Sequence, residues 1–99
     1  MGDLRTSLRI ASGVIVWAAH FAAIYGTTGL ACARDAAGLV PWAVGGATLV
    51  AGAMASFIFL REWRMRASFN NWLAATIAAI SLLAIVWEGI TVLIVPACA

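Results

Sequence analysis

The chain has 99 residues, of which 65% are hydrophobic and 10% are charged, and its formal net charge is +2. Its mean hydropathy of +1.03 is far above that of soluble domains, and a chain this short cannot bury so much apolar surface internally. The composition excludes a water-soluble globular domain and indicates an all-α integral membrane protein.

The first apolar run covers residues 8–33 and exceeds the roughly 20 residues that a membrane-spanning helix requires. Arg5 and Arg9 lie at its start and small residues end it, as in some cleaved signal peptides. The run is longer than the apolar core of a signal peptide and contains His20. We therefore expect an uncleaved spanning helix.

Two further runs of spanning length follow, at residues 41–60 and 71–95. In the break before residue 41, Gly38 is expected to end the first helix and Pro41 to lie in the first turn of the second. The next break carries three arginines and ends in Asn70 and Asn71, which can cap the third helix. The sequence thus predicts three transmembrane helices in a single membrane domain over residues 1–99.

Arginines are distributed unevenly between the two ends of these helices. If the chain crosses the membrane three times, Arg34 is the one arginine on its side of the membrane. The other side carries Arg5, Arg9, Arg61, Arg64 and Arg66. Basic residues accumulate on the cytoplasmic side, so the N-terminus is predicted to be cytoplasmic and the C-terminus periplasmic. The absence of lysine and the abundance of alanine are typical of a GC-rich bacterial genome, which suggests the bacterial inner membrane.

This topology brings Cys32 and Cys98 to one membrane face. A periplasmic face favours oxidation, and a disulfide forms if the Cα atoms approach within roughly 4.4–6.8 Å. Alternatively, both cysteines are small apolar residues near the lipid boundary. Two thiols with no histidine or carboxylate nearby do not complete a four-ligand zinc site, so no metal is expected.

Two ionisable residues lie deep in the predicted helices. His20 is twelve residues from Cys32 and Glu88 is ten from Cys98, which places them at similar depths of roughly 18 and 15 Å. A charge in this position costs about 2.5–3.5 kcal/mol. We expect either that His20 and Glu88 pair, or that each separately bonds a hydroxyl or backbone group. The candidate supporting groups are Tyr25, Ser81 and Thr91.

The second helix carries a face of small residues at close spacing, formed by Gly45, Thr48, Gly52 and Ser56. Such a face lets helix backbones approach closely and predicts a helix contact without indicating the partner.

Other chemistry is limited by the residues present. His20 could supply one axial ligand to haem or a chlorin, and Glu88 could act as a proton or cation site. The sequence has no phosphate loop, nucleophile elbow or metal-ligand cluster, so we expect neither an enzyme nor a bound cofactor. We interpret the arginines as orientation signals and expect no nucleic-acid partner.

Residues 16–33 read VWAAHFAAIYGTTGLACA, with Trp17, His20, Phe21, Tyr25 and Cys32 in that spacing. This stretch resembles small uncharacterised proteobacterial membrane proteins encoded beside haem-copper oxidase genes. The resemblance implies an accessory role in respiration. Together with the short loops and the small-residue faces of the helices, this resemblance favours a structural subunit that packs against a larger membrane complex. The alternatives are a homo-oligomeric transporter or channel using Glu88, and a haem or pigment protein using His20.

Overall fold

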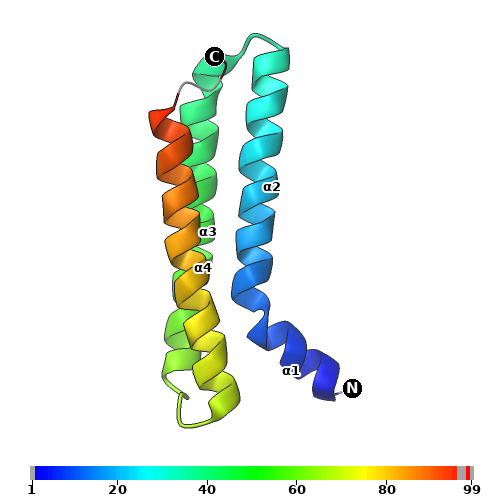
Figure 1. The fold of residues 1–99 in the computed structure, drawn as a ribbon, viewed down its shortest axis with the longest axis vertical. Coiled ribbons are helices and arrows are strands. Elements are labelled where there is room, and N and C mark those ends of the chain that lie inside the picture. Colours follow the sequence, from blue (N-terminus) through cyan, green and yellow to red (C-terminus); the bar gives the residue numbers. More distant parts are fainter. Residues whose placement is uncertain (1, 96–97, 99) are drawn as a thin grey trace.

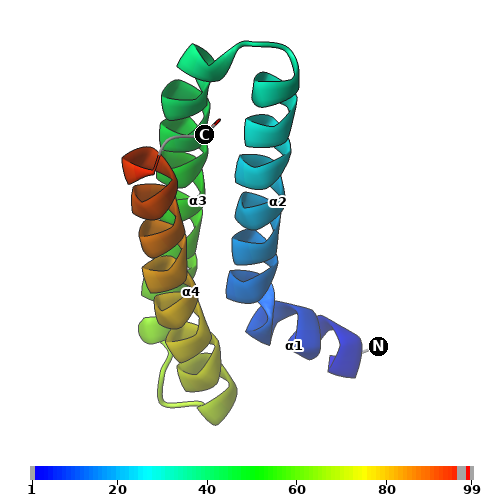
Figure 2. The same cartoon turned by 45° about the horizontal axis from the view of Figure 1, so that its top comes forward.

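The computed structural model describes residues 2–95 and 98. Its elements are, in chain order, α1 (Gly2–Ile10), α2 (Ser12–Ala33), the short 3-10 helix η1 (Ala37–Leu39), α3 (Val40–Trp63) and α4 (Phe69–Ile94). Helices α2, α3 and α4 form an up-down-up bundle, and α1 leans away from one end (Figures 1 and 2). Of the predicted domain over 1–99, positions 1, 96–97 and 99 lie outside the described residues.

Three helical segments are long and apolar enough to cross a membrane, at Ser12–Ala33, Ala37–Trp63 and Phe69–Ile94. In each, only 22% of the most apolar window is buried inside the bundle. Water would meet apolar side chains over most of the surface, whereas lipid accommodates them. The prediction of an all-α, multi-pass membrane protein is confirmed.

The first predicted helix starts in the wrong place. The chain breaks at Ala11, so residues 8–10 belong to α1, and the spanning helix begins at Ser12. The Ser12 hydroxyl donates to the Arg9 carbonyl at 2.8 Å, which supports this break. The second predicted helix ends too early, since α3 continues to Trp63.

The helix-end predictions are confirmed in one case and wrong in two. Pro41 lies in the first turn of α3, as predicted. Helix α2 ends at Ala33 and is closed by Asp35, not by Gly38. Asp35 has a φ of 56°, and the amide of Ala36 donates to the Ala31 carbonyl at 2.7 Å, as in a helix terminus closed by a left-handed residue. Ser68, not an asparagine, is the N-cap residue of α4.

The bundle interior is layered. One apolar cluster packs in the half nearer α1, and the other packs in the opposite half. The first cluster consists of Val16, Ala51, Ala55, Ile58, Ala78 and Ile85, and the second of Ile24, Ala31, Val40 and Val44. On each helix, a polar residue lies between the two clusters. The layer so formed contains His20, Thr48 and Glu88.

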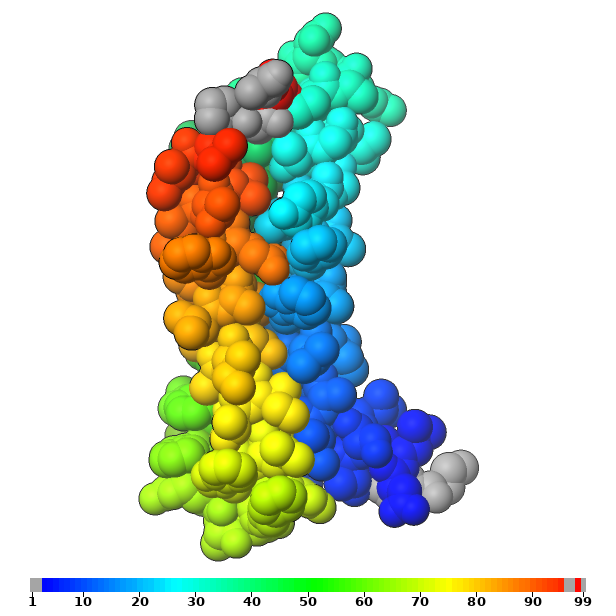
Figure 3. All heavy atoms as spheres, in the orientation of Figure 1, coloured from blue at the N-terminus to red at the C-terminus, as the bar shows by residue number. Residues whose placement is uncertain are grey.

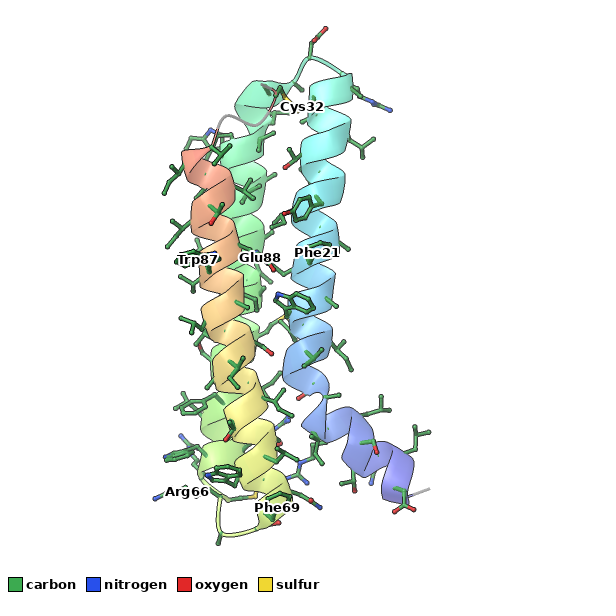
Figure 4. All side chains as sticks on the ribbon, viewed as in Figure 1. Phe21, Cys32, Arg66, Phe69, Trp87 and Glu88 are labelled. Atoms are coloured by element: carbon green, nitrogen blue, oxygen red, sulfur yellow. A yellow bond between two sulfur atoms is a disulfide. The ribbon has the colours of Figure 1, made fainter. Side chains whose placement is uncertain are left out.

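The two ends of the bundle differ chemically. We call one the disulfide end, because it carries the Cys32–Cys98 bridge. We call the other the arginine end, because it carries Arg66 (Figure 4) and the Arg9 and Arg61 side chains that bind Glu62. Figure 3 shows α2 and α4 in contact along most of the bundle, with α1 projecting at the arginine end. The arginine bias in the sequence therefore corresponds to one physical end of the molecule.

Gly13 allows α2 and α4 to approach closely. A Cβ atom at Gly13 would lie 2.8 Å from Ala78 Cα. Because that neighbour is backbone, the helices would have to separate. We expect Gly13→Ala to lower the free energy of unfolding by about 2 kcal/mol, in the range of overpacked cores, measured by detergent titration with SDS. Gly26→Ala is the matched control, since nothing lies within 4 Å of a Cβ there. Equal stability of the two variants would contradict this packing.

Candidate functional site

The polar layer begins with His20, whose side chain is completely buried. Its Nε2 atom lies 2.9 Å from Thr48 Oγ1 on α3. A buried imidazole needs such a partner because lipid and apolar side chains supply none. His20 therefore connects α2 to α3 by a hydrogen bond whose direction depends on the tautomer.

Glu88 enters the layer from α4. Its Oε1 atom accepts a hydrogen bond of 2.8 Å from the Trp17 indole, which lies one turn before His20 on α2. The Glu88 side chain is 20% exposed, so it lies at the edge of the interface and not at its centre. Figure 4 shows Glu88 on the side of α4 that faces α2. Trp17 thus holds the carboxyl group against the bundle.

His20 and Glu88 also approach each other directly. His20 Nδ1 lies 3.8 Å from Glu88 Oε2, and each of these atoms is buried without a hydrogen-bond partner among the described residues. The separation is longer than a hydrogen bond but short enough for a water molecule or a small shift to connect the two groups. The structure thus brings both residues to one level, with their hydrogen bonds directed to Thr48 and Trp17.

The supporting groups proposed from the sequence are not the ones that bond this pair. Tyr25 is 57% exposed, and its ring packs on Phe21 with centroids 4.5 Å apart. The Thr91 hydroxyl donates to the carbonyl of Trp87 in its own helix. Ser81 is buried beside Gly13, away from the pair. Thr48 and Trp17 take the roles expected for these three residues.

The environment of His20 does not suit an axial ligand of haem or a chlorin. Its Nε2 atom is bonded to Thr48 and its Nδ1 atom points to Glu88, and the side chain has no exposed surface. A macrocycle would need one nitrogen at an open face. Within residues 2–95 and 98, no three His, Cys, Asp or Glu side chains gather closely enough to hold a metal ion.

The small residues of α3 have different surroundings. Thr48 packs against Gly89 of α4, where an added Cβ would meet Thr48 Oγ1 at 2.5 Å. Gly52 lies near Leu82 of α4, and Ser56 is half-buried. Gly45 is also half-buried, and an added Cβ there would meet nothing within 4 Å. The fully buried face of α3 lies beside these positions, at Val44, Ala51, Ala55 and Ile58.

Of the two alternatives for Cys32 and Cys98, the structure has the disulfide bridge. Their Cα atoms are 5.6 Å apart and the sulfurs are bonded. The bridge links the last turn of α2 to the segment that follows α4, which are 66 residues apart in the sequence. It therefore closes the disulfide end of the bundle.

A second polar cluster, which the sequence analysis missed, lies at the arginine end. Its centre is Glu62, whose side chain is completely buried. Arg9 donates to both carboxylate oxygens, at 2.9 and 3.0 Å. Arg61 donates to the same carboxylate at 3.0 Å and Asn71 at 2.6 Å. This Glu62 network joins α1, α3 and α4.

A signal for Glu62 was available in the helical spacing. Ala51, Ala55, Ile58 and Glu62 follow one another at intervals of four, three and four residues, which is one face of a helix. The predicted second helix ends at residue 60, so that prediction leaves Glu62 in the break between the second and third helices. One further turn of helix places its carboxylate in the interior.

The Glu62 network also positions α1. Leu4 and Leu8 lie one turn apart and are 63% and 53% exposed, a pattern typical of a helix that lies along a membrane surface. The Arg9 guanidinium is cationic under physiological conditions, and the hydrogen bond to Glu62 raises its pKa further. Arg9 thereby ties the end of α1 to the bundle.

Comparison with known proteins finds no relative. No protein-family model, curated protein or solved structure matches this chain.

The hydrogen bond between His20 and Thr48 can be tested by Thr48→Val, which removes the hydroxyl and keeps the shape. His20 Nε2 then loses its partner in the interior, and we expect the free energy of unfolding to fall by about 1 kcal/mol. Ser56→Ala on the same helix is the control, because the Ser56 hydroxyl makes no hydrogen bond among the described residues. Both variants are measured by SDS titration, and an equally small loss in each would show that Thr48 does not support His20.

Proposed function

We propose that this chain is a small accessory subunit that packs through α2 against a transmembrane helix of a larger bacterial membrane complex. The observation that carries the proposal is the outer face of α2. In its middle, the exposed residues opposite His20 are Ala18, Ala22, Gly26 and Gly29. A Cβ atom at either glycine would meet nothing within 4 Å. Small residues at this spacing let a second helix approach closely.

The most exposed residues of the other two helices are larger than those in this middle stretch of α2, although α2 itself also exposes Ile15, Phe21 and Leu30. On α3, Leu49 and Phe57 are 77% and 65% exposed, and on α4, Leu83 and Trp87 are 71% and 73% exposed. Large apolar side chains of this kind suit contact with lipid tails. The contrast within one bundle supports α2 as the surface that another helix covers.

Tyr25 lies at the edge of this small-residue face. Its hydroxyl makes no hydrogen bond among the described residues, although the residue is eight positions, or roughly 12 Å, from the end of α2 at Ala33. An unbonded hydroxyl at that depth is unfavourable in lipid. A polar group on an adjoining helix would satisfy it.

The orientation in the membrane is part of the proposal. The arginine end is assigned to the cytoplasm because basic residues accumulate there. The disulfide at the other end is suited to the oxidising periplasm. These independent features support an inner-membrane protein with a cytoplasmic N-terminus. The resemblance of residues 16–33 to proteins encoded beside haem-copper oxidase genes suggests a respiratory complex as the partner.

Co-purification in mild detergent tests the proposal. We expect a large stoichiometric partner with the natural chain, and loss of that partner when Ala22 and Gly26 are both replaced by leucine. The matched control replaces Ala79 and Gly46 by leucine, which adds the same bulk at exposed positions of α4 and α3. Retention of the partner by both double variants would contradict docking through α2. Purification of the natural chain only with copies of itself would contradict the accessory role.

Glu88 supports one alternative, a homo-oligomeric transporter or channel. Its Oε2 atom has no hydrogen-bond partner among the described residues, and 20% of its side chain is exposed at the edge of the bundle. Proton or cation flux into liposomes that contain the purified chain, abolished by Glu88→Gln, would favour this function over the accessory role.

A further inference from the structure

The outer surface of α3 is hollowed along the half that ends at the arginine end. The hollow nearest that end has a volume of about 380 Å³ and is lined by Phe57, Leu60, Arg61, Arg64 and Met65. Two guanidinium groups and three large apolar side chains thus share one surface depression. Helix α4, by contrast, carries no arginine.

Two further hollows continue from this one. The middle hollow, of about 300 Å³, shares Phe57 with the first and includes Met54. The third, of about 260 Å³, shares Met54 and lies between α2 and α3, where Ala19, Ala23 and Val50 line it. Arg64 and Val50 are fourteen residues apart, or about 21 Å along the helix. The three hollows share lining residues, and we call them together the groove; it extends farther than the roughly 15 Å depth of one lipid leaflet.

The polar end of the groove contains two arginines, of which Arg61 is bound to Glu62 and Arg64 is not bound to an acidic group among the described residues. Arg61 donates through one nitrogen to Glu62, and its guanidinium lies 5.9 Å from the centre of the Phe57 ring. Four of its five N–H donors remain available for another group. Arg64 makes no hydrogen bond or ion pair among the described residues. Since Arg9 also neutralises Glu62, this end of the groove carries net positive charge.

We propose that this groove binds an anionic phospholipid, with the phosphate on Arg61 and Arg64 and an acyl chain along Phe57 and Met54. The guanidinium group matches phosphate oxygens in charge and geometry. Toward the centre of the bundle the groove is lined by apolar side chains apart from His20, whose side chain is completely buried. A soluble phosphate compound would leave that part empty, whereas a lipid fills both parts.

The experiment uses the purified full chain in detergent, mixed with dioleoylphosphatidylglycerol or dioleoylphosphatidylcholine, with bound lipid counted by native mass spectrometry. We expect preferential retention of the anionic lipid and a loss of about fivefold in its affinity for Arg64→Gln. Arg66→Gln is the matched control. It removes the same charge from the same end (Figure 4), but its guanidinium lies over the Trp63 ring at 4.6 Å and is not among the residues that line the groove.

A second variant tests the apolar part of the site without changing the charge. Ala53 lines the middle hollow, so Ala53→Phe is expected to fill it and weaken binding of the anionic lipid, whereas Ala79→Phe on α4 is expected to leave binding unchanged. Equal retention of both lipids, equal losses for the Arg64 and Arg66 variants, or no effect of Ala53→Phe would each overturn the proposal. All four variants change exposed residues, and circular dichroism checks that the helices persist.

Discussion

Replacement of Glu62 by glutamine is expected to lower the free energy of unfolding by about 3 kcal/mol, the equivalent of one to two charge-assisted hydrogen bonds. The carboxylate is completely buried and accepts from Arg9, Arg61 and Asn71. The loss is smaller than the number of contacts suggests, because the Arg9 and Arg61 side chains are 45% and 44% exposed. Water therefore screens both cations once the carboxylate is gone. SDS titration measures the change.

The same substitution is expected to release α1. Without the carboxylate, Arg9 has no strong link to the bundle, and the amides of residues 2–10 should exchange hydrogen faster than in the natural chain. Asp3→Asn is the control, because it removes an exposed carboxylate from the first turn of the same helix. Unchanged exchange in the Glu62 variant, or equal effects of both substitutions, would show that the Glu62 network does not hold α1.

Removal of the disulfide is expected to have the next largest effect, equal to that of Gly13→Ala. A bridge between residues 66 apart contributes up to about 4 kcal/mol through loop entropy in water. The spanning helices remain inserted in the membrane when the bundle opens, so removal of the bridge gives the opened chain less additional conformational entropy than it would in water. We therefore expect the free energy of unfolding to fall by about 2 kcal/mol. The variant in which serine replaces Cys32 and Cys98 should match the natural chain treated with dithiothreitol.

The serine variant also provides the control for reduction. Its stability in SDS titration should not respond to dithiothreitol, since the described residues contain no other cysteine. A natural chain that shows the same stability before and after reduction would indicate that the bridge does not constrain the bundle.

Two polar clusters and one covalent bond thus hold a bundle whose apolar contacts are made largely by small side chains. Alanines provide much of the buried surface in the half nearer α1, including Ala51, Ala55 and Ala78. Small residues bring backbones close but bury little area each. The polar layer of His20, Thr48 and Glu88, the Glu62 network and the disulfide lie at separate depths. Each therefore fixes the helices at a different level.

The sequence alone determined the number and approximate positions of the spanning helices, because the length of an apolar run is a local property that the bilayer thickness makes decisive. The uneven arginines likewise indicated one distinct end. The sequence also placed Cys32 and Cys98 on one membrane face. Cys32 lies at the end of the first span and Cys98 follows the third, so both lie on the face opposite the N-terminus. None of these inferences requires knowledge of how a helix is rotated about its axis.

The partners of the polar side chains were decided only by the tertiary structure. His20 bonds Thr48, Glu88 bonds Trp17, and Glu62 is buried, although the sequence suggested other hydroxyls for the first two and a loop for the third. In a membrane protein, the lipid-facing and core-facing sides of a helix are both apolar, so the pattern that reveals helix rotation in soluble proteins is weak. A difference of one residue turns a side chain by about 100°, and only packing against the neighbouring helices selects its direction.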